Sequence, residues 1–74
     1  GQIDVVEYDV APGCPAAGKR IRDIKMPRGV LVAAIIRTED VIVPKGDDHV
    51  QAGDSVIVFA TPENLSAVKR LFAK

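Results

Sequence analysis

The chain has 74 residues, 47% of them hydrophobic, and its ten basic and ten acidic side chains give a formal net charge of zero. This length fits one small domain, and so high an apolar content argues against intrinsic disorder. Nucleic-acid-binding proteins usually carry a clustered positive excess, whereas the basic cluster here is small and interrupted by Asp23. Its members are Lys19, Arg20, Arg22 and Lys25. We therefore expect no nucleic-acid partner.

Several residues belong to types that are often catalytic or metal-binding, but they lack the partner residues that such sites need. Cys14 is the only cysteine, so no internal disulfide and no cysteine-based metal site can form. His49 is the only histidine, and no neighbour completes a catalytic dyad or triad. The loop aspartates lack the alternating oxygen ligands of a calcium loop and suit turns instead. They are Asp47, Asp48 and Asp54. We expect neither a metal site nor an enzyme, and no apolar run reaches the ~18 residues of a membrane span.

Residues 2–10 predict a first strand, because apolar and acidic side chains alternate from Val6 to Val10. Ile3 and Val5 fall in the opposite phase, which indicates a bulge or a partly covered second face. A proline-containing loop, residues 11–15, ends this strand.

Residues 16–25 predict a short helix. Ala17, Ile21 and Ile24 recur at i, i+4 and i+7 and form one narrow apolar stripe. Pro27 ends the helix near Met26, since the residue before a proline disfavours helical geometry.

The run Val30–Ile36 contains no polar residue, which is typical of a strand that is buried on both faces. A tight polar connection, residues 37–40, joins it to a second apolar run at 41–43, so the two should form an antiparallel hairpin. The domain's own helices can cover one face of this sheet. The other face needs a partner, and a second copy of the chain is the obvious candidate.

The last part of the chain predicts a strand at 56–59 and a helix that begins near residues 61–64. Thr61 is placed to cap this helix, and Pro62 suits its first position. Leu65, Val68 and Phe72 form its apolar stripe. The chain therefore predicts an α+β domain with a small mixed or antiparallel sheet of about four strands. A short helix follows the first strand and a second helix ends the chain, in the order β-α-β-β-β-α.

Several short segments, in their order and spacing, resemble the C-terminal domain of regulators of potassium conductance, the TrkA-C or RCK-C family. They are Glu7-Tyr8-Asp9-Val10, Gly18-Lys19, Met26-Pro27-Arg28-Gly29-Val30, Ile35-Ile36-Arg37, Val43-Pro44, Gln51-Ala52-Gly53-Asp54 and Thr61-Pro62-Glu63. The resemblance covers essentially the whole chain. It identifies residues 1–74 as a single regulatory domain, which we expect to be a fragment of a longer chain.

This resemblance implies a cytoplasmic module that is attached to a potassium channel, a potassium uptake system or another cation transporter. Such modules commonly form homodimers, and they usually follow a nucleotide-binding Rossmann-like domain, which these 74 residues do not contain. The expected partners are a second copy and a membrane-embedded transporter or channel subunit. The domain itself is expected to hold no cofactor.

In several family members a small regulatory ligand, cyclic di-AMP in the best-known case, lies at the end of the central hairpin and contacts both copies. The corresponding residues here are Ile36, Arg37, Val41, Ile42 and Pro44. The guanidinium group of Arg37 suits phosphates and stacks on bases. Two other interpretations remain open for Arg37: a solvated hairpin residue, or an ion-pair partner of Glu39 or Asp40.

The function predicted from the resemblance is control of transport by ligand sensing and dimerisation. The alternative is a purely structural dimerisation domain of another membrane transporter, with no ligand. Both depend on the same apolar sheet, and a titration with cyclic dinucleotides separates them.

Overall fold

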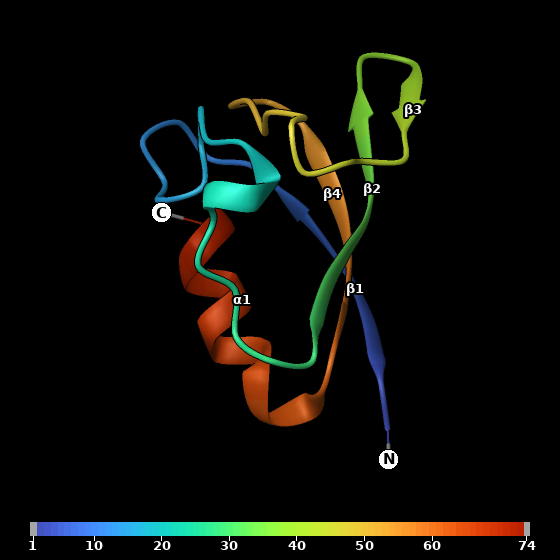
Figure 1. Ribbon diagram of the computed structural model, residues 1–74, viewed down its shortest axis with the longest axis vertical. Coiled ribbons are helices and arrows are strands. Elements are labelled where there is room, and N and C mark those ends of the chain that lie inside the picture. Colours follow the sequence, from blue (N-terminus) through green and yellow to red (C-terminus); the bar gives the residue numbers. More distant parts are fainter. Residues whose placement is uncertain (1, 74) are drawn as a thin grey trace.

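The computed structural model describes residues 2–73, and this part of the chain forms a four-stranded antiparallel sheet with a C-terminal helix on one side (Figure 1). The strand order is β1-β4-β2-β3. The elements are β1 (Asp4–Asp9), β2 (Val30–Arg37), β3 (Asp40–Ile42), β4 (Ser55–Ala60) and α1 (Leu65–Phe72), with 3₁₀ helices at Ile21–Asp23 and Pro62–Asn64. The predicted α+β class, the four strands and the C-terminal helix are confirmed.

The hydrophobic core lies between the sheet and α1. From α1, Val68 and Phe72 are fully buried, as the predicted apolar stripe requires, and from β4 so are Val56 and Val58. The ring of Phe72 stacks on that of Tyr8 in β1, with 6.3 Å between ring centroids. We call the side of the sheet that contacts α1 the inner face.

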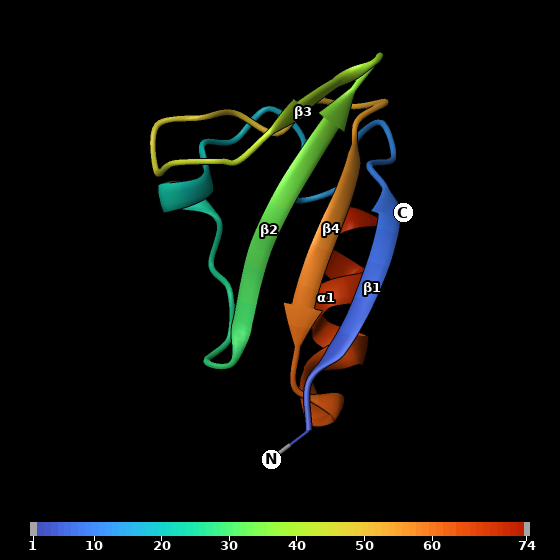
Figure 2. The same cartoon turned by 90° about the vertical axis from the view of Figure 1, so that its right-hand side faces the viewer.

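The opposite side of the sheet, which we call the open face, has no described segment over it. Figure 2 shows α1 behind the sheet and this face toward the viewer. Val5 and Leu31 both pair with Phe59 of β4, so three apolar side chains form one row across three strands. Val5 is 64% exposed and Leu31 is 61% exposed. One face of Val30–Ile36 is therefore left exposed in a single copy, as predicted for a sheet whose second face needs a partner. Burial of that face by a second copy stays a prediction.

A bulge in β2 explains how its residues are divided between the faces. Its register against β4 shifts between Val32 and Ala34. Val32 and Ile35 are an odd number of residues apart, which would put them on opposite faces of a regular strand. The extra residue brings both into the core, where they are buried. By contrast, β1 pairs with β4 residue for residue, so the irregularity suggested near Ile3 and Val5 is exposure rather than a bulge.

The predicted helix at residues 16–25 is wrong: the structure has only a 3₁₀ turn at Ile21–Asp23. Gly18 has a φ of 83°, which breaks a right-handed helix. The backbone of this segment instead pairs with a loop distant in sequence. The N–H of Gly18 donates to the carbonyl of Val50, and the N–H of Val50 donates to the carbonyl of Lys19. Ile24 is still buried, so the apolar stripe marked core residues correctly but not their backbone conformation.

Hydrogen bonds among Thr61, Asn64 and the carbonyl of Arg28 form a small polar clamp at the start of α1. Pro62 opens the 3₁₀ helix as predicted, but the Thr61 side chain makes no capping hydrogen bond. Its hydroxyl instead accepts a hydrogen bond from Asn64 Nδ2 at 2.8 Å, and the same nitrogen donates to the carbonyl of Arg28 at 2.6 Å. The clamp ties the start of α1 to the turn before β2.

Candidate ligand-binding corner

The predicted ligand residues lie at the end of the β2–β3 hairpin, which we call the corner. In the backbone register of the hairpin, Arg37 lies opposite Asp40 and Ile36 lies opposite Val41. The two strands are joined through Thr38 and Glu39, a two-residue loop of the tight kind that the sequence predicts.

The sheet distributes these residues over both of its faces. Ile36 and Val41 are cross-strand partners, so their side chains share the open face, where Val41 is 68% exposed. Arg37 and Ile42 each follow a residue of that face and therefore point to the other side, where Ile42 packs against the core. Pro44 is half-buried just beyond β3. The structure thus brings Ile36 and Val41 together and separates them from Arg37 by the thickness of the strand.

Arg37 forms a bidentate ion pair with Asp54. Its Nε donates to Oδ1 and its Nη2 donates to Oδ2, both at 2.9 Å, and Nη2 also donates to the carbonyl of His49 at 3.0 Å. Neither Glu39 nor Asp40, the partners considered from the sequence, forms this pair. The pairing depends on β2 lying beside β4, which brings residue 54, just before β4, next to the end of β2.

Asp54 is a buried carboxylate whose hydrogen bonds are satisfied. It is 2% exposed, and its Oδ2 also accepts from the backbone N–H of Gln51 at 2.9 Å. The hydrogen bond from Arg37 lowers the pKa of Asp54 below its ordinary value, more than burial raises it. The same bond raises the pKa of Arg37. Both groups are therefore charged at neutral pH. From the sequence, Asp54 is predicted to be a turn residue, and its hydrogen bond from Gln51 confirms that role. Its ion pair with Arg37 is not predicted from the sequence.

The other loop residues singled out in the sequence have local roles. Asp48 Oδ2 accepts from the N–H of Lys45 at 2.7 Å, which confirms a turn-forming aspartate. Asp47 pairs with Arg22 at the surface. The His49 side chain is exposed, and its backbone contributes the carbonyl that Arg37 contacts. Cys14, expected in a loop, lies in a loop and is buried against the core.

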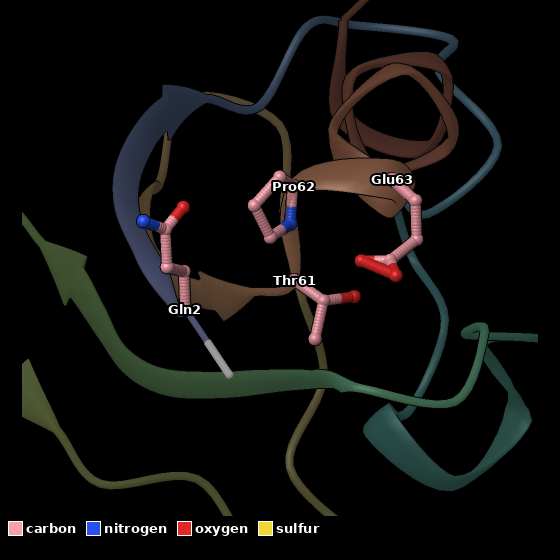
Figure 3. A pocket seen from close by; sticks show the side chains of 4 residues that line it. All are labelled: Gln2, Thr61, Pro62 and Glu63. Carbon is pink, nitrogen blue, oxygen red and sulfur yellow. The ribbon is translucent and has the colours of Figure 1, made fainter.

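Two surface hollows lie at the other end of the sheet and include none of the predicted ligand residues. One, of about 290 Å³, is lined mainly by the open face, including Ile3, Leu31 and Phe59. The other, of about 410 Å³, is lined by Gln2, Thr61, Pro62 and Glu63 (Figure 3). In Figure 3 the polar ends of Gln2 and Glu63 stand on either side of Pro62 rather than converging. For ligand binding the corner is the better candidate, because it combines a fixed guanidinium group at the end of β2 with two apolar side chains, Ile36 and Val41, on the open face.

Within residues 2–73, no group of three or more histidine, cysteine or acidic side chains is arranged to hold a metal ion. Nor does this described part contain a helix long and apolar enough to cross a membrane. What the geometry offers is an open face that carries a row of exposed apolar side chains and reaches the charged corner at one end.

The structure is that of a small α+β domain with one face covered by its own helix and a row of exposed apolar side chains across the other, the kind of surface that marks interaction sites. Residues 5–73 match the family model described as the TrkA-C domain. The chain therefore belongs to the TrkA-C domain family, as the resemblance of its sequence predicts.

Among curated proteins, the similar ones include Trk system potassium uptake proteins. TrkA homolog 2 of Methanosarcina mazei is 32% identical over 97% of this chain, and the TrkA homolog of Archaeoglobus fulgidus is 33% identical over 97%. The matched region is 16% of each of those proteins, so this chain spans about one sixth of their length. TrkA of Mycobacterium tuberculosis is 32% identical over 96% of this chain and 32% of its own length.

A solved structure described as an RCK domain with cda has the same fold. Its TM-score is 0.80, with 24% sequence identity, over 92% of this chain and 96% of that one. At this identity the likeness shows the fold alone.

Proposed function

We propose that this chain is a non-catalytic regulatory domain of a potassium uptake system, or of a related potassium channel or cation transporter, and that it acts on the cytoplasmic side of the membrane. The observation that carries the proposal is the match of residues 5–73 to the TrkA-C family. The relatives described as Trk potassium uptake proteins support the choice of ion. In this proposal the membrane-embedded transporter is the partner, and the domain controls its activity.

The proposed form of the domain is a homodimer joined through the open face. Two neighbouring strands and the edge strand beyond them each expose a large apolar side chain there, namely Leu31, Phe59 and Val5. Exposed apolar patches of more than a few hundred Å² mark interaction sites on soluble domains. A second copy would cover this surface with an equally apolar one, as a two-fold symmetric interface requires.

The proposed ligand is a cyclic dinucleotide, cyclic di-AMP, bound at the corner between two copies. Ile36 and Val41 offer an apolar surface for a base, and Arg37 lies at the strand end with its side chain 35% exposed. The description of the structural relative as an RCK domain with cda supports a ligand in this fold. Binding would change the relative placement of the two copies, and the attached transporter would respond.

Calorimetric titration of the 74-residue chain with cyclic di-AMP, together with sedimentation equilibrium, tests the ligand and the dimer. We expect heat that saturates at one ligand per two chains and a dimer at high micromolar concentration. Arg37→Ala should lower the affinity at least tenfold, to a value that can still be measured, and leave the dimer intact. A monomer that takes up no ligand contradicts both parts of the proposal.

Control of transport needs a separate experiment. The chain would replace the TrkA-C domain of a Trk uptake protein in cells that lack other potassium uptake. We expect potassium influx that responds to cyclic di-AMP, and a loss of that response in the same chimera with Arg37→Ala. Equal influx with and without the domain would contradict a regulatory role.

The second candidate is a ligand-free structural dimerisation domain. The observation that favours it is the ion pair with Asp54, because it occupies much of the Arg37 guanidinium group. A stable dimer that gives no heat and no thermal shift with cyclic dinucleotides would select this candidate.

A further inference from the structure

Arg37 is fixed by three hydrogen bonds, and these determine which of its donors remain for a ligand. Nε and Nη2 donate to Asp54, and Nη2 donates again to the carbonyl of His49. A guanidinium group has five N–H donors, so two remain, both on Nη1. Within residues 2–73 no protein acceptor contacts Nη1.

The position of these bonds restricts the way an anion can approach. Arginine binds phosphates most strongly when two parallel N–H groups form a fork. One fork of Arg37, formed by Nε and Nη2, is fully occupied by Asp54. The other fork combines Nη1 with Nη2, and its Nη2 donor is occupied by His49. What remains is the two N–H donors of Nη1 and the flat face of the guanidinium group.

Asp54 is well placed to keep this arrangement. It is almost completely buried, and the N–H of Gln51 holds it at a fixed point just before β4. A bidentate pair also fixes the plane of the guanidinium group, which a single contact cannot do. The pair is formally neutral, so Arg37 presents directed hydrogen bonds rather than a net positive charge.

We infer that Asp54 is a positioning residue for the corner: it holds Arg37 so that Nη1 and the guanidinium face are presented to a phosphate-bearing, base-containing ligand. This inference rests on the proposed function, because it takes Arg37 to be a ligand contact. It specifies the mode of recognition, which is one phosphate oxygen on Nη1 with a base against the guanidinium plane. Binding should therefore depend weakly on ionic strength, since the ligand meets a neutral pair.

The first test is a titration of variants with cyclic di-AMP, each checked for folding by circular dichroism. We expect Asp54→Asn to lower the affinity at least tenfold, because the amide holds the guanidinium group less firmly. Asp47→Asn is the matched control, since it removes an exposed carboxylate of the same loop that pairs with Arg22. It should change the affinity less than twofold.

A double-variant comparison separates positioning from an independent role of Asp54. If Asp54 acts through Arg37, Arg37→Ala with Asp54→Asn should bind no more weakly than Arg37→Ala alone. Wild-type affinity in Asp54→Asn alongside a loss in Arg37→Ala overturns the inference and leaves the proposed function standing. If the wild-type chain takes up no cyclic di-AMP, the proposed function fails, and the inference fails with it.

A second measurement needs no variant, so it stands even where Asp54→Asn does not fold. The Nε–Hε NMR signal of Arg37 in the wild-type chain reports directly on the bond to Asp54. We expect it to keep its position and its slow exchange with water at saturating cyclic di-AMP, while signals of Ile36 and Val41 shift. A solvent-like, rapidly exchanging Nε–Hε signal in the complex would mean that the ligand displaces Asp54, which overturns the inference.

Discussion

Gly29 occupies the most restricted backbone position in the turn before β2. Its φ is 84°, and a Cβ built there would lie 2.9 Å from the hydroxyl oxygen of Thr61. Thr61 cannot move away easily, because its hydroxyl is held by Asn64, which also binds the carbonyl of Arg28. The turn and the start of α1 therefore fit together only with glycine at this position.

Gly29→Ala should destabilise the fold through both backbone strain and this close contact, by about 2–4 kcal/mol in total. Gly18→Ala is the matched control, since its φ is 83° but no atom lies within 4 Å of the added Cβ. It should cost about 1–2 kcal/mol from strain alone. Urea unfolding followed by circular dichroism measures both values, and equal losses would contradict the close contact at Thr61.

Asp54 should make the stability of the domain depend on pH. Its folded pKa lies below the ordinary carboxyl value of 3.8 because Arg37 donates to it. The unfolded chain therefore binds the proton at a higher pH than the folded chain does. The stabilisation is fully present above the unfolded pKa and is lost as the pH falls from there through the lower folded pKa.

Urea unfolding at several pH values between 7 and 2.5 tests this dependence. Asp54→Asn should be less stable at pH 7 by about 1–3 kcal/mol, because it leaves Arg37 without its charged partner. Its stability should also fall less steeply below pH 4 than that of the wild-type chain. Asp47→Asn, which removes an exposed carboxylate, should keep the wild-type slope. Parallel curves for all three proteins would exclude Asp54 as the source of the effect.

At the scale of single elements, the hairpin carries local strain at its tip. Thr38 has a φ of 56°, a conformation that is rare for a β-branched residue. Two-residue hairpin loops favour glycine or asparagine at such positions. The neighbour Glu39 is not in the positive-φ region.

Thr38→Gly should therefore stabilise the domain by about 0.5–1 kcal/mol, because the relief of strain exceeds the entropy that glycine adds to the unfolded chain. Glu39→Gly, one residue further on, relieves no such strain and should destabilise it by a similar amount. Thermal unfolding of the two variants beside the wild-type chain gives the signs. A loss of stability in Thr38→Gly would show that the threonine side chain makes a contact worth more than the strain.

The elements that the sequence predicted well are those whose patterns are local. The alternation in β1, the hairpin turn and the apolar stripe of α1 each depend on residues a few positions apart. The helix expected at residues 16–25 had a local pattern too, but Gly18 and the distant carbonyl of Val50 decided its backbone conformation. An i, i+4 pattern of apolar residues predicts neither the φ angle of a glycine nor a backbone hydrogen bond to a distant loop.

The corner shows the same limit. The sequence identified Arg37 and both halves of the hairpin, but it offered Glu39 and Asp40 as ionic partners. The true partner, Asp54, is 17 residues away and reaches Arg37 because β4 lies between β1 and β2. A strand order of this kind is set by packing of the whole sheet, and the bulge between Val32 and Ala34 adds a register shift that hydrophobic alternation does not reveal.

At the scale of the whole molecule, residues 2–73 form a core on one side of the sheet and leave large apolar side chains exposed on the other. The inner face is closed by α1, where Val68 and Phe72 are fully buried. The open face exposes large side chains at both ends, with Leu31 near the start of β2 and Val41 at the corner. The proposed dimer and the proposed ligand both use residues of this surface. Substitutions at its two ends can therefore show which part of it joins the two copies.

Charged substitutions on the open face should separate association from folding. Val5→Lys with Leu31→Lys places two charges beside Phe59, on side chains that are more than 60% exposed in a single copy. We expect a monomer in sedimentation equilibrium, with a free energy of unfolding of the single chain within ~0.5 kcal/mol of the wild-type value. Val41→Lys places a charge at the corner end of the open face. Ser66→Lys, at an exposed position of α1, is the control that should stay dimeric.

The pattern of results assigns the interface to part of the face. Dissociation by both the Val5/Leu31 and the Val41 variants means that the partner copy covers the whole open face. Dissociation by Val41→Lys alone limits the interface to the corner, next to the proposed ligand, and leaves the row at Phe59 for the transporter. If all the lysine variants sediment like the wild-type dimer, the two copies meet elsewhere and the open face is not their interface.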